Sequence, residues 1–170
     1  MSVGDPTLTI GSWLQHVSNR LAANGYRPMR PEVYQPHGYL YGAHYSGFEI
    51  TKFGMVERFF LFANIADLDA NKLRQYSNAT FQFANKNKSI SLPNGLFTCT
   101  HVFPVVITTD LDSRLAEFLR SSTPVSHWAA FEMPVVFDLA NRSLHYYQTT
   151  PIWGAAYHAG FRKEVQKNLI

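Results

Sequence analysis

The sequence predicts an α+β domain in which helices pack on a mainly antiparallel sheet. Three observations lead to this prediction. The chain has 170 residues, a usual length for one domain; hydrophobic residues make up 46% of it; and its helical and strand-like patterns do not alternate regularly. We expect a single domain over residues 1–170, in the order helix, three-strand meander, helix, strand, short helix, hairpin and C-terminal helix.

The first helix is expected to begin near Ser12, where apolar residues recur at helical spacing along one face: Trp13, Leu14, Val17 and Leu21. Ser12 and Gln15 fit the capping box that satisfies backbone donors at a helix start, and Gly25 fits a left-handed stop. Three prolines follow between residues 27 and 38, which predicts an extended connector.

Three strands joined by tight turns should come next, over residues 39–45, 48–53 and 56–65. Ser46-Gly47 and Gly54 mark the expected turns. The third strand is almost continuously apolar, which is typical of a strand covered on both faces. We therefore place it at the centre of the sheet.

The rest of the chain contains five further predicted elements: a helix over 69–85, an extended segment over 96–109, a short helix over 113–120, a hairpin over 135–147 and a helix over 153–169. Pro104 removes one backbone donor from the extended segment, which indicates a bulge or a position at the sheet edge. The last helix is expected because Trp153, Tyr157, Phe161, Val165 and Leu169 recur every four residues.

Cysteine content and the first residues indicate the compartment. Cys99 is the only cysteine, so the chain cannot form an internal disulfide. Residues 1–10 lack the basic and apolar regions of a secretory signal, and prolines, glycine and polar residues interrupt the longest uncharged stretch. We expect a cytoplasmic protein with no membrane segment.

Two Asp-x-Asp pairs are the most suggestive acidic groups: Asp67 with Asp69, and Asp110 with Asp112. Carboxylate oxygens are ligands for Mg²⁺, so the four residues could support a metal-dependent hydrolase or nuclease. Both pairs also lie where a strand is followed by a helix, and Asp is a preferred N-cap residue. We favour capping and keep the metal enzyme as the alternative.

Histidines near acidic or thiol groups are the other catalytic candidates. His127 and Glu132 could act in general acid/base catalysis, although a structural hydrogen bond is the commoner arrangement. Cys99 and His101 should point to the same side of a strand, but no cysteine-hydrolase signature surrounds them. The histidine spacings do not fit a zinc site and the glycines do not form a phosphate-binding loop, so we expect no metal and no cofactor.

Recognition residues are expected between residues 26 and 45, where cationic and aromatic side chains alternate: Arg27, Arg30, His37, Tyr39 and Tyr41. The segment could present these side chains to a ligand or partner, or serve only as a surface connector.

Low charge, with 16% charged residues, and abundant Tyr and Phe favour a surface that a partner covers. The leading functional prediction is a non-enzymatic protein-interaction or ligand-binding module that forms a homodimer or binds another protein. The alternatives are the metal enzyme described above and a weak nucleic-acid-binding domain that uses Lys86 and Lys88. The formal charge of +3 is spread along the chain, which argues against nucleic acid.

Overall fold

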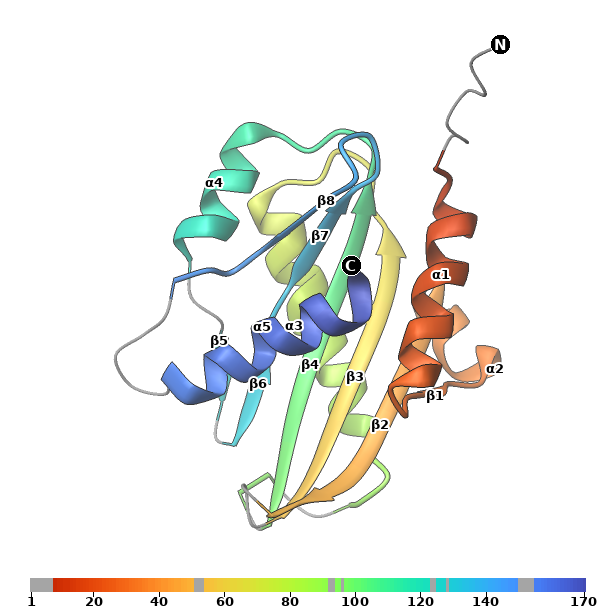
Figure 1. Ribbon diagram of the computed structural model, residues 1–170, viewed down its shortest axis with the longest axis vertical. Helices are drawn as coiled ribbons and strands as arrows, with labels where there is room; N and C mark the ends of the chain where they lie inside the picture. Colours follow the sequence, from red (N-terminus) through yellow and green to blue (C-terminus); the bar gives the residue numbers. More distant parts are fainter. Residues whose placement is uncertain are drawn as a thin grey trace.

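The computed structural model describes residues 8–50, 54–91, 94–95, 97–122, 125–127, 129–149 and 155–170. Helices cover both faces of one mixed sheet (Figure 1). The helices are α1 (Ile10–Ala23), α2 (Pro31–Tyr34), the 3-10 helix η1 (Gln35–His37), α3 (Ala70–Lys86), α4 (Ser113–Ser121) and α5 (Ala155–Leu169). The strands are β1 (Arg27–Pro28), β2 (Tyr41–Glu49), β3 (Gly54–Asn64), β4 (Thr98–Thr108), β5 (Val125–His127), β6 (Ala130–Glu132), β7 (Val135–Asp138) and β8 (Ser143–Tyr146).

The sheet runs in the order β1-β2-β3-β4-β6-β5, and β7 pairs with both β4 and β8. β1, β2 and β3 are antiparallel, whereas β4 lies parallel to β3, β6 and β7. The α+β class is therefore confirmed, but the mainly antiparallel sheet is wrong. The reason is that α3 carries the chain back along the sheet, so that β4 starts at the same end as β3.

The predicted meander is also different in detail. Ser46-Gly47, the expected turn, lies within the continuous strand β2, where Gly47 pairs with Val56. The connector contains α2 and η1, because Pro31 stands at the first helical position, where a missing N–H costs no hydrogen bond. The only strand in the connector is the two-residue β1. Residues 51–53 of the predicted second strand lie outside the described residues.

Pro104 lies in the middle of the sheet and in continuous register with β3, so both the predicted edge position and the alternative of a bulge in the pairing with β3 are wrong. It is opposite Leu61 of β3. On its other side, pairing with β6 ends at Val102 and pairing with β7 begins at Val105. The missing donor thus coincides with the interruption between β6 and β7.

Helix α1 has a different N-cap from the predicted one. Thr9 and Ser12 form the capping box, in which the Thr9 hydroxyl accepts from the Ser12 N–H at 3.1 Å and the Ser12 hydroxyl accepts from the Thr9 N–H at 3.0 Å. The left-handed stop is confirmed, because Gly25 has a φ of +86°.

The sheet has a separate hydrophobic core on each of its two faces. α1 and α5 cover one face, where Trp13 stacks on Phe137 at 4.0 Å and Phe161 packs near Phe103. α3 covers the other, where Phe81 and Phe83 join the core of Phe59 and Leu61. β3 contributes to both cores, which confirms its central position. Of the residues predicted to form the buried face of the last helix, Phe161, Val165 and Leu169 are buried. Trp153 and the side chain of Tyr157 lie outside the described residues.

Across the described ranges, no helix is both long and apolar enough to cross a membrane.

Candidate functional site

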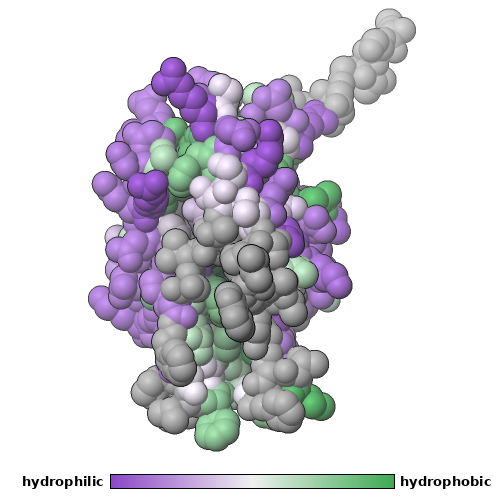
Figure 2. Space-filling model, turned by 90° about the vertical axis from the view of Figure 1, so that its left-hand side faces the viewer, coloured by the Kyte–Doolittle hydropathy of each residue, from purple (hydrophilic) through white to green (hydrophobic). Residues whose placement is uncertain are grey.

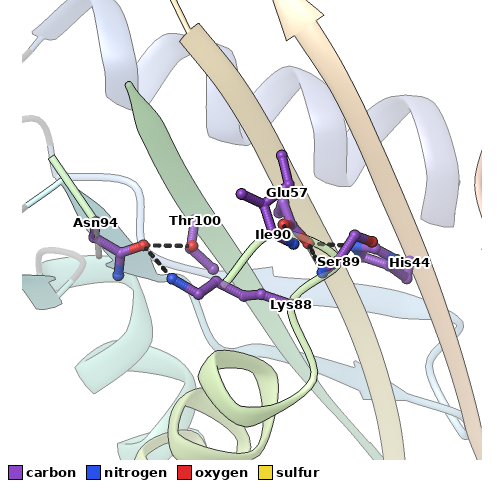
Figure 3. Close-up of polar contacts among 7 residues, drawn as sticks. All are labelled: His44, Glu57, Lys88, Ser89, Ile90, Asn94 and Thr100. Atoms are coloured by element: carbon purple, nitrogen blue, oxygen red, sulfur yellow. Dashed lines mark hydrogen bonds and ion pairs between the residues drawn. The ribbon is translucent and has the colours of Figure 1, made fainter. Parts of the chain in front are cut away.

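Glu57 of β3 is a buried carboxylate at the end of the sheet where β3 and β4 begin, which is the lower end in Figure 1. Its side chain is only 1% exposed. It accepts three hydrogen bonds: from His44 Nε2 at 2.7 Å, from the Ser89 N–H at 2.9 Å and from the Ile90 N–H at 3.0 Å (Figure 3). Three donors can replace the hydrogen bonds to water that an ionised carboxylate loses when it is buried.

The three donors come from two different parts of the chain. His44 lies on β2, two residues before Ser46, the cross-strand partner of Glu57, so both side chains emerge on the face that α3 covers. Ser89 and Ile90 follow the end of α3, where the chain turns back toward β4. The backbone that connects α3 to β4 therefore passes directly over Glu57.

The hydrogen bonds set the charge of Glu57. Burial by itself would raise the pKa of this carboxyl group. The bonds from His44, Ser89 and Ile90, together with the charge of His44, outweigh burial and hold the pKa below its usual value. Glu57 is therefore ionised at neutral pH, and its carboxylate accepts the His44 Nε2–H.

A second polar cluster holds the connection between α3 and β4 in place (Figure 3). The Asn94 side-chain oxygen accepts from Lys88 Nζ at 3.1 Å and from Thr100 Oγ1 at 2.9 Å. Thr100 lies directly opposite Glu57 on β4. The two clusters thus fix the connecting segment over the beginnings of β3 and β4.

A pocket of about 350 Å³ opens beside His44, lined by Gly25, Arg27, His44, Ser46 and Ser89. Arg27 of β1 is the cross-strand partner of His44, so their side chains lie on the same face of the sheet. The pocket combines one permanent cation, one imidazole and two hydroxyl groups.

Large apolar side chains are exposed at the same end of the sheet. Phe48 is 65% exposed, Ile50 76% and Phe97 75%. Met55 links two of them, because it is the cross-strand partner of Phe48 and its N–H donates to the Phe97 carbonyl at 2.8 Å. Figure 2 shows hydrophobic surface at this lower end of the molecule.

The outer edge of β2 is covered over a short length only. β1 pairs with Ala43 and His44, and among the described residues no strand pairs with β2 beyond His44 on that side. The Met29 N–H donates to the Gly42 carbonyl at 2.8 Å, so the backbone groups of Gly42 and His44 face this edge. Backbone N–H and C=O groups of successive residues point alternately to the two sides of a strand. The backbone groups of Ser46 and Phe48 therefore face the outer edge as well.

The predicted caps are confirmed for two aspartates. Asp69 accepts from the Lys72 N–H at 2.8 Å at the start of α3, and Asp112 accepts from the Arg114 N–H at 2.8 Å at the start of α4. Asp67 and Asp110 are exposed at the ends of the preceding strands. Within the described part of the chain, no three His, Cys, Asp or Glu side chains lie together in a way that could hold a metal ion.

His127 and Glu132 are brought together by the pairing of β5 with β6. His127 Nε2 and Glu132 Oε1 are 2.5 Å apart, and the His127 ring stacks on Phe81 at 4.0 Å. Ser77 of α3, which the sequence did not point to, donates to the other oxygen of Glu132 at 2.6 Å. The carboxylate lies between the serine and the histidine, so the serine bonds to Glu132 and not to the imidazole, unlike the nucleophile of a serine–histidine pair.

Cys99 and His101 lie on the same side of β4, as predicted, with 3.2 Å between Sγ and Nε2. His101 is buried and its ring lies 4.6 Å from that of Phe161, so the pair faces α5 on the side of the sheet away from Glu57.

The five predicted recognition residues do not form one surface. Tyr39 is buried under α3 and its hydroxyl donates to Thr80 Oγ1 at 3.2 Å, whereas Tyr41 packs near Phe62 on the opposite face. Arg27, Arg30 and His37 are exposed, and Arg27 is the one that lines the described pocket. Sequence reasoning missed Glu57 and His44. The available signal was an acidic residue at the start of a strand predicted to be buried on both faces.

Comparisons with known proteins add no relative. No protein-family model matches the chain, and no curated protein and no solved structure is significantly similar to it.

Proposed function

We propose that this protein is a non-enzymatic interaction module that forms a homodimer through the outer edge of β2. The observation that carries the proposal is the uncovered length of β2 beyond His44, where the backbone groups of Ser46 and Phe48 point outward. A second copy of the chain can pair with this edge in antiparallel fashion, because an antiparallel edge is complementary to itself about a twofold axis.

The side chains on this edge support the proposal. Natural proteins protect an open strand edge with Lys, Pro or a bulge. Neither Ser46 nor Phe48 is such a residue, and β2 pairs with β3 without a bulge from Tyr41 to Glu49. The edge therefore lacks the usual features that keep two strands from pairing.

Apolar burial supplies a further driving force. Phe48, Ile50 and Phe97 are exposed at the same end of the sheet. Burying one large apolar side chain contributes about 1.5–3 kcal/mol, so partial burial of these side chains in a dimer would offset part of the entropy lost on association.

The test is the mass of the protein by light scattering across a concentration series, for the wild type and for Phe48→Pro. Proline removes the outward N–H and is tolerated at an edge strand, so the domain should stay folded while the dimer dissociates. Phe48→Ala is the matched control, since it removes the ring but keeps the N–H. We expect a dimeric wild type, a monomeric Phe48→Pro variant and a weakened dimer for Phe48→Ala.

A wild-type protein that is monomeric at high micromolar concentration would overturn the proposal. So would a Phe48→Pro variant that is folded, by its thermal transition, and as dimeric as the wild type.

A further inference from the structure

The pocket beside His44 has the composition of an anion site. Its described lining residues, Gly25, Arg27, His44, Ser46 and Ser89, include an arginine, a histidine and two serines but no carboxylate. The acidic group in contact with His44, Glu57, is already engaged by three hydrogen-bond donors. Its charge is directed to those donors rather than to a ligand.

Arg27 is suited to the recognition of an oxyanion. Its guanidinium carries a permanent charge and a planar set of donors that matches two oxygens of a phosphate or carboxylate group. It projects from β1 on the same side of the sheet as His44, its cross-strand partner. The hydroxyls of Ser46 and Ser89 add neutral donors to the same pocket.

His44 is held in a donor state by Glu57. Its Nε2 donates to the Glu57 carboxylate at 2.7 Å, so Glu57 fixes the orientation of the imidazole ring. The histidine thereby adds a positioned polar ring to the pocket that Arg27 lines. Among the described residues, the other charged groups at this end include Lys88, which donates to Asn94, the exposed Lys86, and the ion pair of Arg58 with Glu49.

We propose that this pocket binds the phosphate or carboxylate group of a small metabolite. A volume of about 350 Å³ lies within the range of small-molecule pockets and leaves room for more than a bare ion. Arg27 is the principal anion-binding residue, His44 adds a polar ring, and Glu57 acts as a positioning residue for His44. The inference does not depend on self-association, because all the residues that line the pocket belong to one copy of the chain.

The experiment is isothermal titration of the full chain with inorganic phosphate and, separately, with citrate as the carboxylate probe, at constant ionic strength. We expect saturable millimolar or tighter binding of at least one probe. Arg27→Gln should weaken that binding about tenfold or more, because a charged, bidentate contact is lost. Arg30→Gln is the matched control, since Arg30 is an exposed arginine three residues further along that does not line this pocket.

His44→Gln provides a second variant in case Arg27→Gln does not fold, as judged by its thermal transition. It replaces the positioned imidazole ring by a flexible amide and should also weaken binding. The proposal is overturned if neither probe binds saturably, or if a folded Arg27→Gln or His44→Gln variant binds as tightly as the wild type. Light scattering of the same samples, with and without phosphate, keeps this result separate from the oligomeric state.

Discussion

The two ends of the parallel pair β3–β4 carry acidic groups in opposite situations. At the upper end, where the strands finish, four aspartates are exposed, and Asp69 and Asp112 each accept one helix N–H. At the lower end, the carboxylate of Glu57 is buried and accepts three hydrogen bonds. A cluster of acidic residues in the sequence therefore does not show which carboxylate is buried and accepts several hydrogen bonds in the fold.

The difference follows from the path of the chain. Each strand leads at its upper end straight into a helix, and the aspartates satisfy the first helix donors. At the lower end, the segment after α3 has to cross the beginnings of both strands before it enters β4. Its free N–H groups meet Glu57 there, and β2 supplies His44 from the other side.

The largest expected effect is that of Glu57→Ala. This change leaves two partly buried N–H groups and a largely buried histidine side chain without their acceptor, which should lower the free energy of unfolding by about 3 kcal/mol. Chemical denaturation at neutral pH measures it. Glu117→Ala is the control, because Glu117 pairs with Arg120 at 2.9 Å on an exposed helix surface, and removal of such a pair should cost less than about 1 kcal/mol.

The wild type and the Glu57→Ala variant can also be compared at lower pH. Because the pKa of Glu57 is lowered in the folded state, its contribution to the free energy of unfolding is present above the unfolded pKa. That contribution is lost as the pH falls through the folded pKa. The stability difference between the wild type and Glu57→Ala should shrink over that range. A difference below about 1 kcal/mol at neutral pH would show that the buried carboxylate is no more important than an exposed one.

A smaller effect is expected at the upper end. Asp69→Ala and Asp112→Ala should each lower the free energy of unfolding by about 1 kcal/mol, whereas Asn at either position should cost little, since Asn caps nearly as well as Asp. Thermal unfolding of the four variants tests this. Equal losses for Ala and Asn would mean that the carboxylate charge, rather than the cap, is required at this end.

No effect is expected from divalent cations. If the aspartates serve as caps, Mg²⁺ or Mn²⁺ should not raise the thermal stability, whereas a cation that binds only the folded state at a hundred times its dissociation constant would add about 2.7 kcal/mol. Titration with Mn²⁺ provides the measurement. Saturable micromolar binding that disappears in Asp69→Asn or Asp112→Asn would favour the metal-dependent hydrolase and give the upper end the functional role.

Local patterns in the sequence predicted those elements that depend on neighbouring residues. The spacing of apolar residues located α1, α3 and α4, and the strand-to-helix position of Asp69 and Asp112 predicted two caps. The same local reasoning failed at Ser46-Gly47, where turn-forming residues are held in β2 by pairing with β3. It also failed between residues 27 and 38, where prolines begin short helices instead of extending the chain.

The sequence by itself determined that β3 is buried on both faces, because nearly every residue of its second half is apolar and neither face can be left in water. Only the tertiary structure decided that β4 runs parallel to β3, that β2 keeps an open edge and that Glu57 receives His44 and the Ser89 and Ile90 N–H groups. These donors are 13, 32 and 33 residues away along the chain. Burial follows from the residues of one segment, whereas pairing and compensation of charge depend on which distant segments the fold brings together.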